Sequence, residues 1–88
     1  MAVKYSEIEF SEVAMEKLSY VHAEWDDEAL VWVATSDDVP GLVTEASTTE
    51  ELIAKLKVMI PELMALNEQS VLGPVPFELL TRRFELTA

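Results

Sequence analysis

The stretch that decides the fold is Leu18-Ser19-Tyr20-Val21-His22-Ala23-Glu24-Trp25, followed after a short connection by Ala29-Leu30-Val31-Trp32-Val33-Ala34-Thr35. Both runs are rich in aromatic and β-branched residues, which is typical of strands. The connection, Asp26-Asp27-Glu28, is polar and turn-like. Two strand-like runs joined in this way predict a β-hairpin.

The second run has apolar residues on both sides of the predicted strand. Side-chain alternation sends them to two faces: Leu30, Trp32 and Ala34 to one, and Val31, Val33 and Thr35 to the other. A strand that is apolar on both faces is usually covered on both faces. One helix covers only one face of a sheet, so we expect the second cover to come from another copy of the chain. The sequence therefore predicts a homo-oligomer, most simply a dimer.

The residues after the hairpin predict a turn, a third strand and one long helix. Val39-Pro40-Gly41 is a turn in which proline fixes its own φ and glycine is free to adopt a positive φ. Leu42 to Ala46 is expected to form a short strand. Ser47-Thr48-Thr49-Glu50 matches a capping box with Ser47 as the N-cap, so a helix is predicted from Thr48 to Asn67.

The predicted helix carries one broad apolar stripe and a proline. Pro61 lies on the side opposite the stripe, so we expect one helix with a kink toward the core, and not two helices. After a loop ending in Gly73-Pro74-Val75-Pro76, the run Phe77 to Leu86 is expected to form a final edge strand. The residues of the stripe are Leu52, Leu56, Met59, Leu63 and Leu66, flanked by Ile53, Ile60 and Met64.

These elements predict an α+β fold: an antiparallel three- to four-stranded sheet with one long helix packed on it, in the order β-β-β-α-β. With 88 residues the chain is expected to form a single domain over residues 18–88. Residues 1–17 are an N-terminal extension in which Ser11 is a candidate cap for a short helix over 12–17.

The composition limits the partners that the chain would bind. It has 17 acidic and 6 basic residues, for a net charge of −11, while half of its residues are apolar. Direct binding of nucleic acid or of an anionic membrane depends on lysine and arginine, so both are disfavoured. The large partner that such a surface favours is basic. The chain lacks cysteine, an apolar signal segment and any long apolar run, so we expect a cytoplasmic protein.

Several residues are candidates for chemical sites. Six acidic residues near the predicted strand ends would form a carboxylate cluster if they met at one end of the sheet, but solvated turns explain them better than a metal site. His22 is the only histidine, and no motif marks a nucleophile beside it, so we expect no enzyme activity, metal or cofactor. The six acidic residues are Glu24, Asp26, Asp27, Glu28, Asp37 and Asp38.

Two aromatic residues and two arginines complete the candidates. Trp25 and Trp32 are expected on the paired strands of the hairpin, where Trp32 would serve equally well in the core or in a subunit interface. Arg82-Arg83 is the only pair of adjacent basic residues. Contact with nucleic acid is one role open to this pair. Protection of an edge strand from aggregation, or pairing with the acidic surface, is favoured over it.

Part of the chain resembles the HicB-like antitoxin superfamily, and within it a branch of short proteins of unknown function. The resemblance covers residues 20–76 and is carried by Trp25 to Glu28, Val31 to Leu42 and Thr44 to Leu52, in which Asp38-Val39-Pro40-Gly41 is the most recognisable segment. It implies a β-β-β-α-β unit described as a partial ribonuclease-H-like fold. It also implies binding and blocking of HicA, a small basic toxin that cleaves mRNA.

The chain departs from the resemblance in two places. Leu42 stands where a cysteine is common, and too few residues follow Pro76 to form the C-terminal DNA-binding module of many HicB proteins. We therefore expect a non-enzymatic module that covers a small basic toxin, with an orphan homo-oligomer as the alternative and a metal-dependent nuclease as a remote third. The candidate interface residues are Trp25, Trp32, Asp26, Asp27, Glu28, Asp37 and Asp38.

Overall fold

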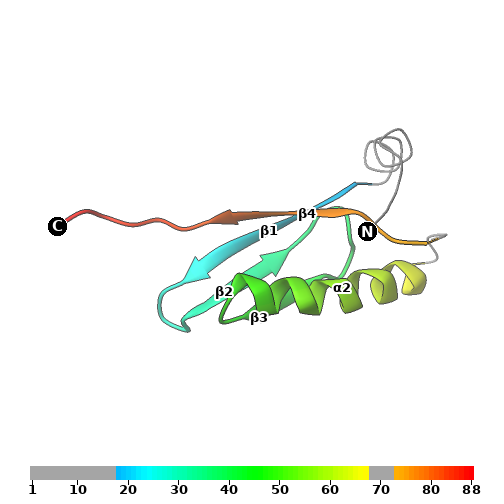
Figure 1. Ribbon diagram of the computed structural model, residues 1–88, viewed down its shortest axis with the longest axis horizontal. Helices are drawn as coiled ribbons and strands as arrows, with labels where there is room; N and C mark the ends of the chain where they lie inside the picture. The colour runs from blue at the N-terminus through cyan, green and yellow to red at the C-terminus, as the bar shows by residue number, and fades with distance from the viewer. Residues whose placement is uncertain (1–17, 68–72) are drawn as a thin grey trace, which may run out of the picture.

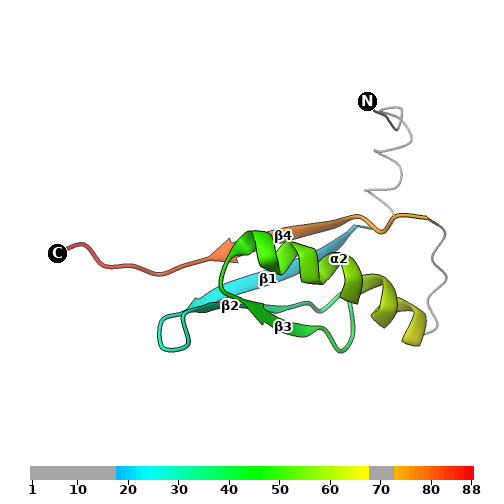
Figure 2. The same ribbon diagram turned by 60° about the horizontal axis from the view of Figure 1, so that its bottom comes forward.

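The computed structural model describes residues 18–67 and 73–88, which form one four-stranded sheet with one long helix packed against it (Figures 1 and 2). The sheet order is β3-β2-β1-β4. The predicted α+β fold with the order β-β-β-α-β is confirmed, whereas the expected helix over 12–17 lies outside the described residues. The elements are β1 (Ser19–Asp26), β2 (Val31–Thr35), β3 (Val43–Ala46), α2 (Thr49–Leu66) and β4 (Phe77–Arg82).

The pairing of β4 differs from the expected antiparallel sheet. Strands β1, β2 and β3 pair antiparallel, but β4 pairs parallel with β1, with Val21 opposite Leu79. The helix α2 crosses the sheet and returns the chain to the end at which β3 began, so β4 runs in the direction of β3. Because β3 and β1 are separated by two antiparallel pairings, they also share a direction. A strand next to β1 must then be parallel to it, which makes the sheet mixed.

The core lies between α2 and one face of the sheet. Leu52, Leu56 and Ile60 are fully buried or nearly so, and the strands meet them with small side chains, chiefly Ala23 and Ala34. Small residues on the sheet allow the helix to lie close to the strands, and the long helix side chains fill the space. The predicted stripe is confirmed except at Leu66, which is 78% exposed because the helix extends beyond the sheet there.

The Pro-Gly turn joins the sheet to the end of the helix. Leu42 N donates to the carbonyl of Val39 at 3.1 Å, and Gly41 has φ 87°, as a type II turn requires of its third residue. The Asn67 side chain donates to the carbonyl of Pro40 at 3.2 Å. The expected positive φ at this glycine is confirmed, and the turn holds the C-terminal end of α2 in place.

The helix begins one residue later than the sequence pattern predicts. Thr48, not Ser47, is the N-cap: its backbone is extended, and its hydroxyl accepts a hydrogen bond from Glu51 N at 3.0 Å. The Ser47 hydroxyl instead donates to the Glu51 carboxylate at 2.7 Å. Two overlapping segments, Ser47 to Glu50 and Thr48 to Glu51, match the capping pattern, so the pattern alone does not choose between them.

The cap assignment is tested by replacing each hydroxyl in turn. Thr48→Ala removes the acceptor of an otherwise unpaired helix N–H and should lower the free energy of unfolding by about 1 kcal/mol. Ser47→Ala removes only an exposed side-chain contact and should cost less than half as much, while Thr48→Ser should retain most of the stability. Urea unfolding followed by circular dichroism measures all three. A larger loss for Ser47→Ala than for Thr48→Ala would contradict the assignment.

Candidate interaction site

The acidic hairpin turn is built by one of its own carboxylates. Asp26 Oδ1 accepts hydrogen bonds from Glu28 N at 2.9 Å and from Ala29 N at 3.1 Å, and Leu30 N donates to the carbonyl of Asp26 at 2.7 Å. Aspartate favours turns because its side chain can bond to the backbone two or three residues ahead. Asp26 thus holds the turn in shape, and the remaining acids of the turn are left to face solvent.

The turn closes through a residue in an unfavourable backbone conformation. Leu30 has φ 60° and a side chain that is 61% exposed. A side chain with a Cβ is disfavoured in this left-handed region, where glycine is accepted without steric cost.

Replacing Leu30 by glycine should therefore stabilise the hairpin. Glycine removes the steric cost of the left-handed backbone, and this effect outweighs the greater entropy of glycine in the unfolded chain. We expect the free energy of unfolding to rise by up to about 1 kcal/mol. Leu30→Ala is the matched control, because it shortens the exposed side chain and keeps the backbone restriction. Equal stabilities of the glycine and alanine variants in urea unfolding would show that the turn is not strained at this position.

Trp25 and Trp32 form an edge-to-face pair next to the turn. They are directly opposite in the β1–β2 ladder, with ring centroids 5.3 Å apart and planes at 63°. Both are half-buried on the face that carries α2, and Trp32 packs against the core. Trp32 thus lies at the margin of the core, and its part in a subunit interface stays a prediction. Trp25 Nε1 donates to Asp27 Oδ1 at 2.7 Å, which links the pair to the acidic turn.

The arginine that follows β4 covers the tryptophan pair. The guanidinium carbon of Arg83 lies 4.4 Å from the centroid of the Trp25 ring, a cation–π geometry. Arg83 Nε also donates to Glu85 Oε2 at 2.6 Å, the only ion pair within residues 18–67 and 73–88. The sequence analysis favoured pairing of Arg82-Arg83 with acidic groups, and Arg83 does pair with Glu85. No pattern in the sequence indicated that Arg83 would also contact Trp25.

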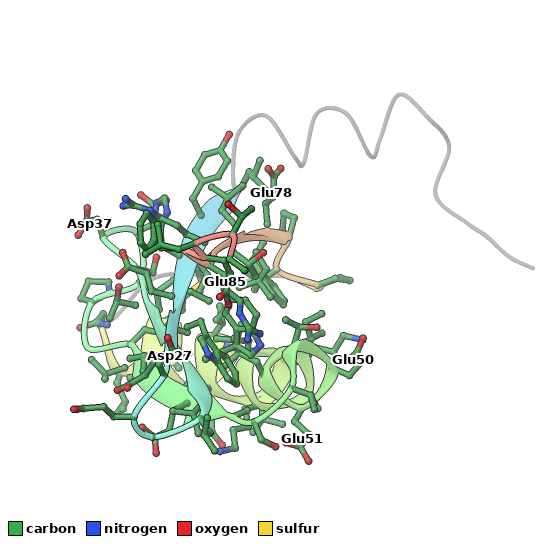
Figure 3. All side chains as sticks on the ribbon, turned by 90° about the vertical axis from the view of Figure 1, so that its left-hand side faces the viewer. Asp27, Asp37, Glu50, Glu51, Glu78 and Glu85 are labelled. Atoms are coloured by element: carbon green, nitrogen blue, oxygen red, sulfur yellow. The ribbon has the colours of Figure 1, made fainter. Side chains whose placement is uncertain are left out.

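The six acidic candidates do not meet at one end of the sheet. Asp26 to Glu28 form the turn between β1 and β2, whereas Asp37 and Asp38 come after β2 has run back along the sheet. Five residues of strand separate the two groups by roughly 16 Å. Figure 3 shows Asp27 and Asp37 projecting from different parts of the surface. The condition for one shared carboxylate cluster is therefore not met, because a hairpin places its turn and its open ends at opposite ends of the sheet.

Asp38 stabilises the backbone at the open end of the hairpin. Its Oδ2 accepts from Tyr20 N at 2.8 Å, and Ser36 Oγ donates to the carbonyl of Tyr20 at 2.6 Å. Asp38 N in turn donates to Ser36 Oγ at 3.1 Å. The chain leaves the sheet after Thr35, so these two side chains replace the backbone partners that Tyr20 would otherwise lack. Asp37 has no such bond among the described residues and is exposed.

Neighbouring aspartates give a matched test of this arrangement. Asp38→Ala should lower the free energy of unfolding by about 1 kcal/mol, because Tyr20 N loses its acceptor. Asp37→Ala removes the same charge and should change stability by less than about 0.5 kcal/mol. Both variants are compared by urea unfolding at one ionic strength. Equal losses in the two variants would contradict the role assigned to Asp38.

The hairpin turn borders an open depression of about 460 Å³ with an acidic rim. The carboxylates of Asp27 and Glu28 are exposed there, and the turn carries no basic side chain. No group of three or more histidine, aspartate or glutamate side chains in the described parts of the chain is arranged to hold a metal ion. The depression is suited to a basic side chain from a partner. It is lined by Glu24, Trp25, Asp26, Asp27, Glu28 and Val33.

The remaining sequence candidates lie elsewhere. His22 is exposed on the face of the sheet that α2 does not cover. Within the described residues, no helix has both the length and the apolar character needed to cross a membrane.

Comparisons with known proteins place the chain in a family that has no assigned activity. Its fold and its hairpin turn define a small α+β domain with an exposed acidic turn beside a tryptophan pair. Residues 13–87 match the family described as "Domain of unknown function (DUF1902)", and the chain belongs to that family. No curated protein matches it.

A solved structure supports the same fold. The chain is 54% identical to a hypothetical protein from the extremely thermophilic bacterium Thermus thermophilus, whose crystal structure is known. The similarity covers 81% of this chain and 97% of that one, with a TM-score of 0.57.

Proposed function

We propose that this protein is a non-enzymatic, antitoxin-like module of the cytoplasm that binds a small basic, HicA-like toxin and covers its RNA-binding surface. The observation that carries the proposal is the depression at the hairpin turn, which has an acidic rim and no basic residue of its own turn to neutralise it. The resemblance of the hairpin, the Pro-Gly turn and the helix start to HicB-like proteins supplies the class of partner.

The proposed mechanism is occlusion guided by charge. A net charge of −11 attracts a basic protein over several ångströms and raises the rate of encounter, most strongly at low salt. At contact, lysine or arginine side chains of the toxin enter the depression and meet Asp27 and Glu28. Trp25 lies beside them, half-buried and with the Arg83 guanidinium over its ring, so it supports the acidic rim from within the domain. A toxin whose basic surface is covered in this way is unable to hold RNA.

The contacts that the candidate residues already make within the chain guide which of them we propose for the interface. Asp26 Oδ1 already accepts two backbone hydrogen bonds, and Asp38 accepts from Tyr20 N at the other end of the hairpin. Asp27 Oδ1 accepts a hydrogen bond from Trp25, so the proposal assigns its Oδ2 to the partner. Trp32 packs against the core. The proposal therefore rests on Trp25, Asp27 and Glu28 at the hairpin turn, with Asp37 too far along the sheet to share the contact.

The test is calorimetric titration with the small basic protein encoded beside this one. The wild-type chain should bind, and more tightly at low ionic strength than at high. Asp27→Asn combined with Glu28→Gln should weaken binding about tenfold or more, because two charged contacts are lost at the centre of the interface. Asparagine at position 27 retains the oxygen that accepts from Trp25, so the tryptophan pair stays in place.

The control carries the same change of charge elsewhere. Asp37→Asn combined with Glu62→Gln alters the net charge equally, at exposed positions away from the hairpin turn. Equal weakening by the two double variants would show that only overall charge matters. No binding at low salt, or the absence of a small basic reading frame beside the gene, would remove the proposal.

A second candidate is an orphan homo-oligomeric module without a toxin. It is favoured by the sheet face opposite α2, which no described element covers (Figure 2). Tyr20 and Val43 are exposed on that face. Native mass spectrometry of the protein purified from its own host separates the two proposals. An orphan module would appear only as assemblies of itself, and an antitoxin would appear with a basic companion.

A further inference from the structure

Strand β4 lies at one edge of the sheet and presents a ladder of backbone groups that no other described strand uses. Ser19 N donates to the carbonyl of Pro76 at 3.2 Å, so the even-numbered residues of this segment direct their backbone groups toward β1. In a strand the next residues point the other way. The N–H and C=O groups of Phe77, Leu79 and Thr81 therefore face the open edge. The prolines at 74 and 76 occupy even positions, so neither removes a donor from that edge.

The chain continues past β4 in an extended conformation with apolar side chains exposed. Figures 1 and 2 show residues 83–88 running on in the direction of β4, beyond the hairpin turn. Phe84 and Leu86 are 74% and 82% exposed, and Leu80 in the strand itself is 39% exposed. Alternation along the strand places these three side chains on one face, the face that α2 leaves open. An exposed edge that ends in an apolar extension is a site for strand pairing.

The charged side chains of β4 are arranged so that two copies of this strand, running antiparallel, place opposite charges next to each other. Glu78 and Arg82 lie on the same face, two residues to either side of Leu80. Arg82 forms no ion pair among the described residues, unlike Arg83. When two such strands run antiparallel with Leu80 at the centre, each Glu78 stands opposite the other strand's Arg82. The molecule carries 6 basic residues against 17 acidic ones, so most of its surface would repel a second copy. The Glu78–Arg82 arrangement instead brings opposite charges of two copies together.

We propose that two copies of this chain pair through β4 about a twofold axis at Leu80, forming one continuous sheet. In this register Leu79 and Thr81 exchange backbone hydrogen bonds with Thr81 and Leu79 of the second copy. Leu80 meets its own counterpart as a non-hydrogen-bonded pair, in which side chains approach closely. Two cross-strand pairs of Glu78 with Arg82 flank this contact.

The same register accounts for the apolar extension. Phe84 comes opposite Pro76 of the second copy, on the face where that copy exposes Tyr20, which is 44% exposed in a single chain. A contact of Phe84 with Pro76 thus lies outside each of the two Glu78–Arg82 pairs. Since the interface is isologous, each of these contacts occurs twice. The dimer goes beyond the proposed toxin binding and does not depend on it, because the hairpin turn with Asp27 and Glu28 plays no part in the pairing.

A cysteine placed at the axis tests the register. The chain has no cysteine, and opposite residues of a non-hydrogen-bonded pair have Cα atoms close enough for a disulfide. Leu80→Cys should cross-link into a covalent dimer under mild oxidation, seen on a non-reducing gel. Val58→Cys, on an exposed position of α2, should cross-link at least about tenfold more slowly. Equal rates for the two variants would overturn the proposal.

Charge reversal supplies an independent test that needs no new bond. Glu78→Arg and Arg82→Glu, each alone, place like charges opposite one another twice and should weaken the dimer about tenfold or more in sedimentation equilibrium. The double variant restores the complementarity and should dimerise nearly as tightly as the wild type. Glu62→Arg and Lys57→Glu are controls with the same charge changes on α2. A monomeric wild-type chain, or a folded double variant as weak as the single ones, would overturn the proposal.

Discussion

The structure depends on the contact between one helix and one face of the sheet. Leu52, Leu56 and Ile60 fill the space above Ala23 and Ala34, and burial of these large side chains is the main source of stability in a chain without disulfides. The same helix carries the chain across the sheet from β3 to β4. Its packing therefore sets both the core and the parallel pairing of the last strand.

A single helix leaves the rest of the sheet with open surfaces. The second face, the outer edge of β4 and the hairpin turn are exposed, and each has its own chemistry. The face and the edge are partly apolar, while the turn is acidic with a tryptophan beside it. We propose that the acidic turn binds a basic partner and that the edge pairs with a second copy of the chain. The two surfaces are compatible, because the turn and the β4–β4 contact involve different residues.

Much of the fold could be predicted from local patterns. The hairpin, the Pro-Gly turn, the third strand and the uninterrupted helix through Pro61 follow from short-range rules, and all are present. The errors occur where a local pattern has two solutions or where its effect depends on distant residues. Ser47 and Thr48 both fit a helix cap, and Leu66 fits the apolar stripe but lies beyond the sheet.

The candidate site was predicted less well than the fold. The acidic residues of the hairpin turn were identified, but Asp26 and Asp38 prove to bind backbone N–H groups, and Asp38 lies at the far end of the sheet. The contact of Arg83 with Trp25 joins residues nearly sixty positions apart, and no spacing rule connects them. By itself the sequence determined the elements, the net charge and the residue types available for binding, because these depend on composition and on near neighbours. Only the tertiary structure decided which carboxylates remain exposed, that the edge strand β4 pairs parallel with β1, and which of its side chains face outward. Those properties depend on how the helix crosses the sheet, which no local pattern contains.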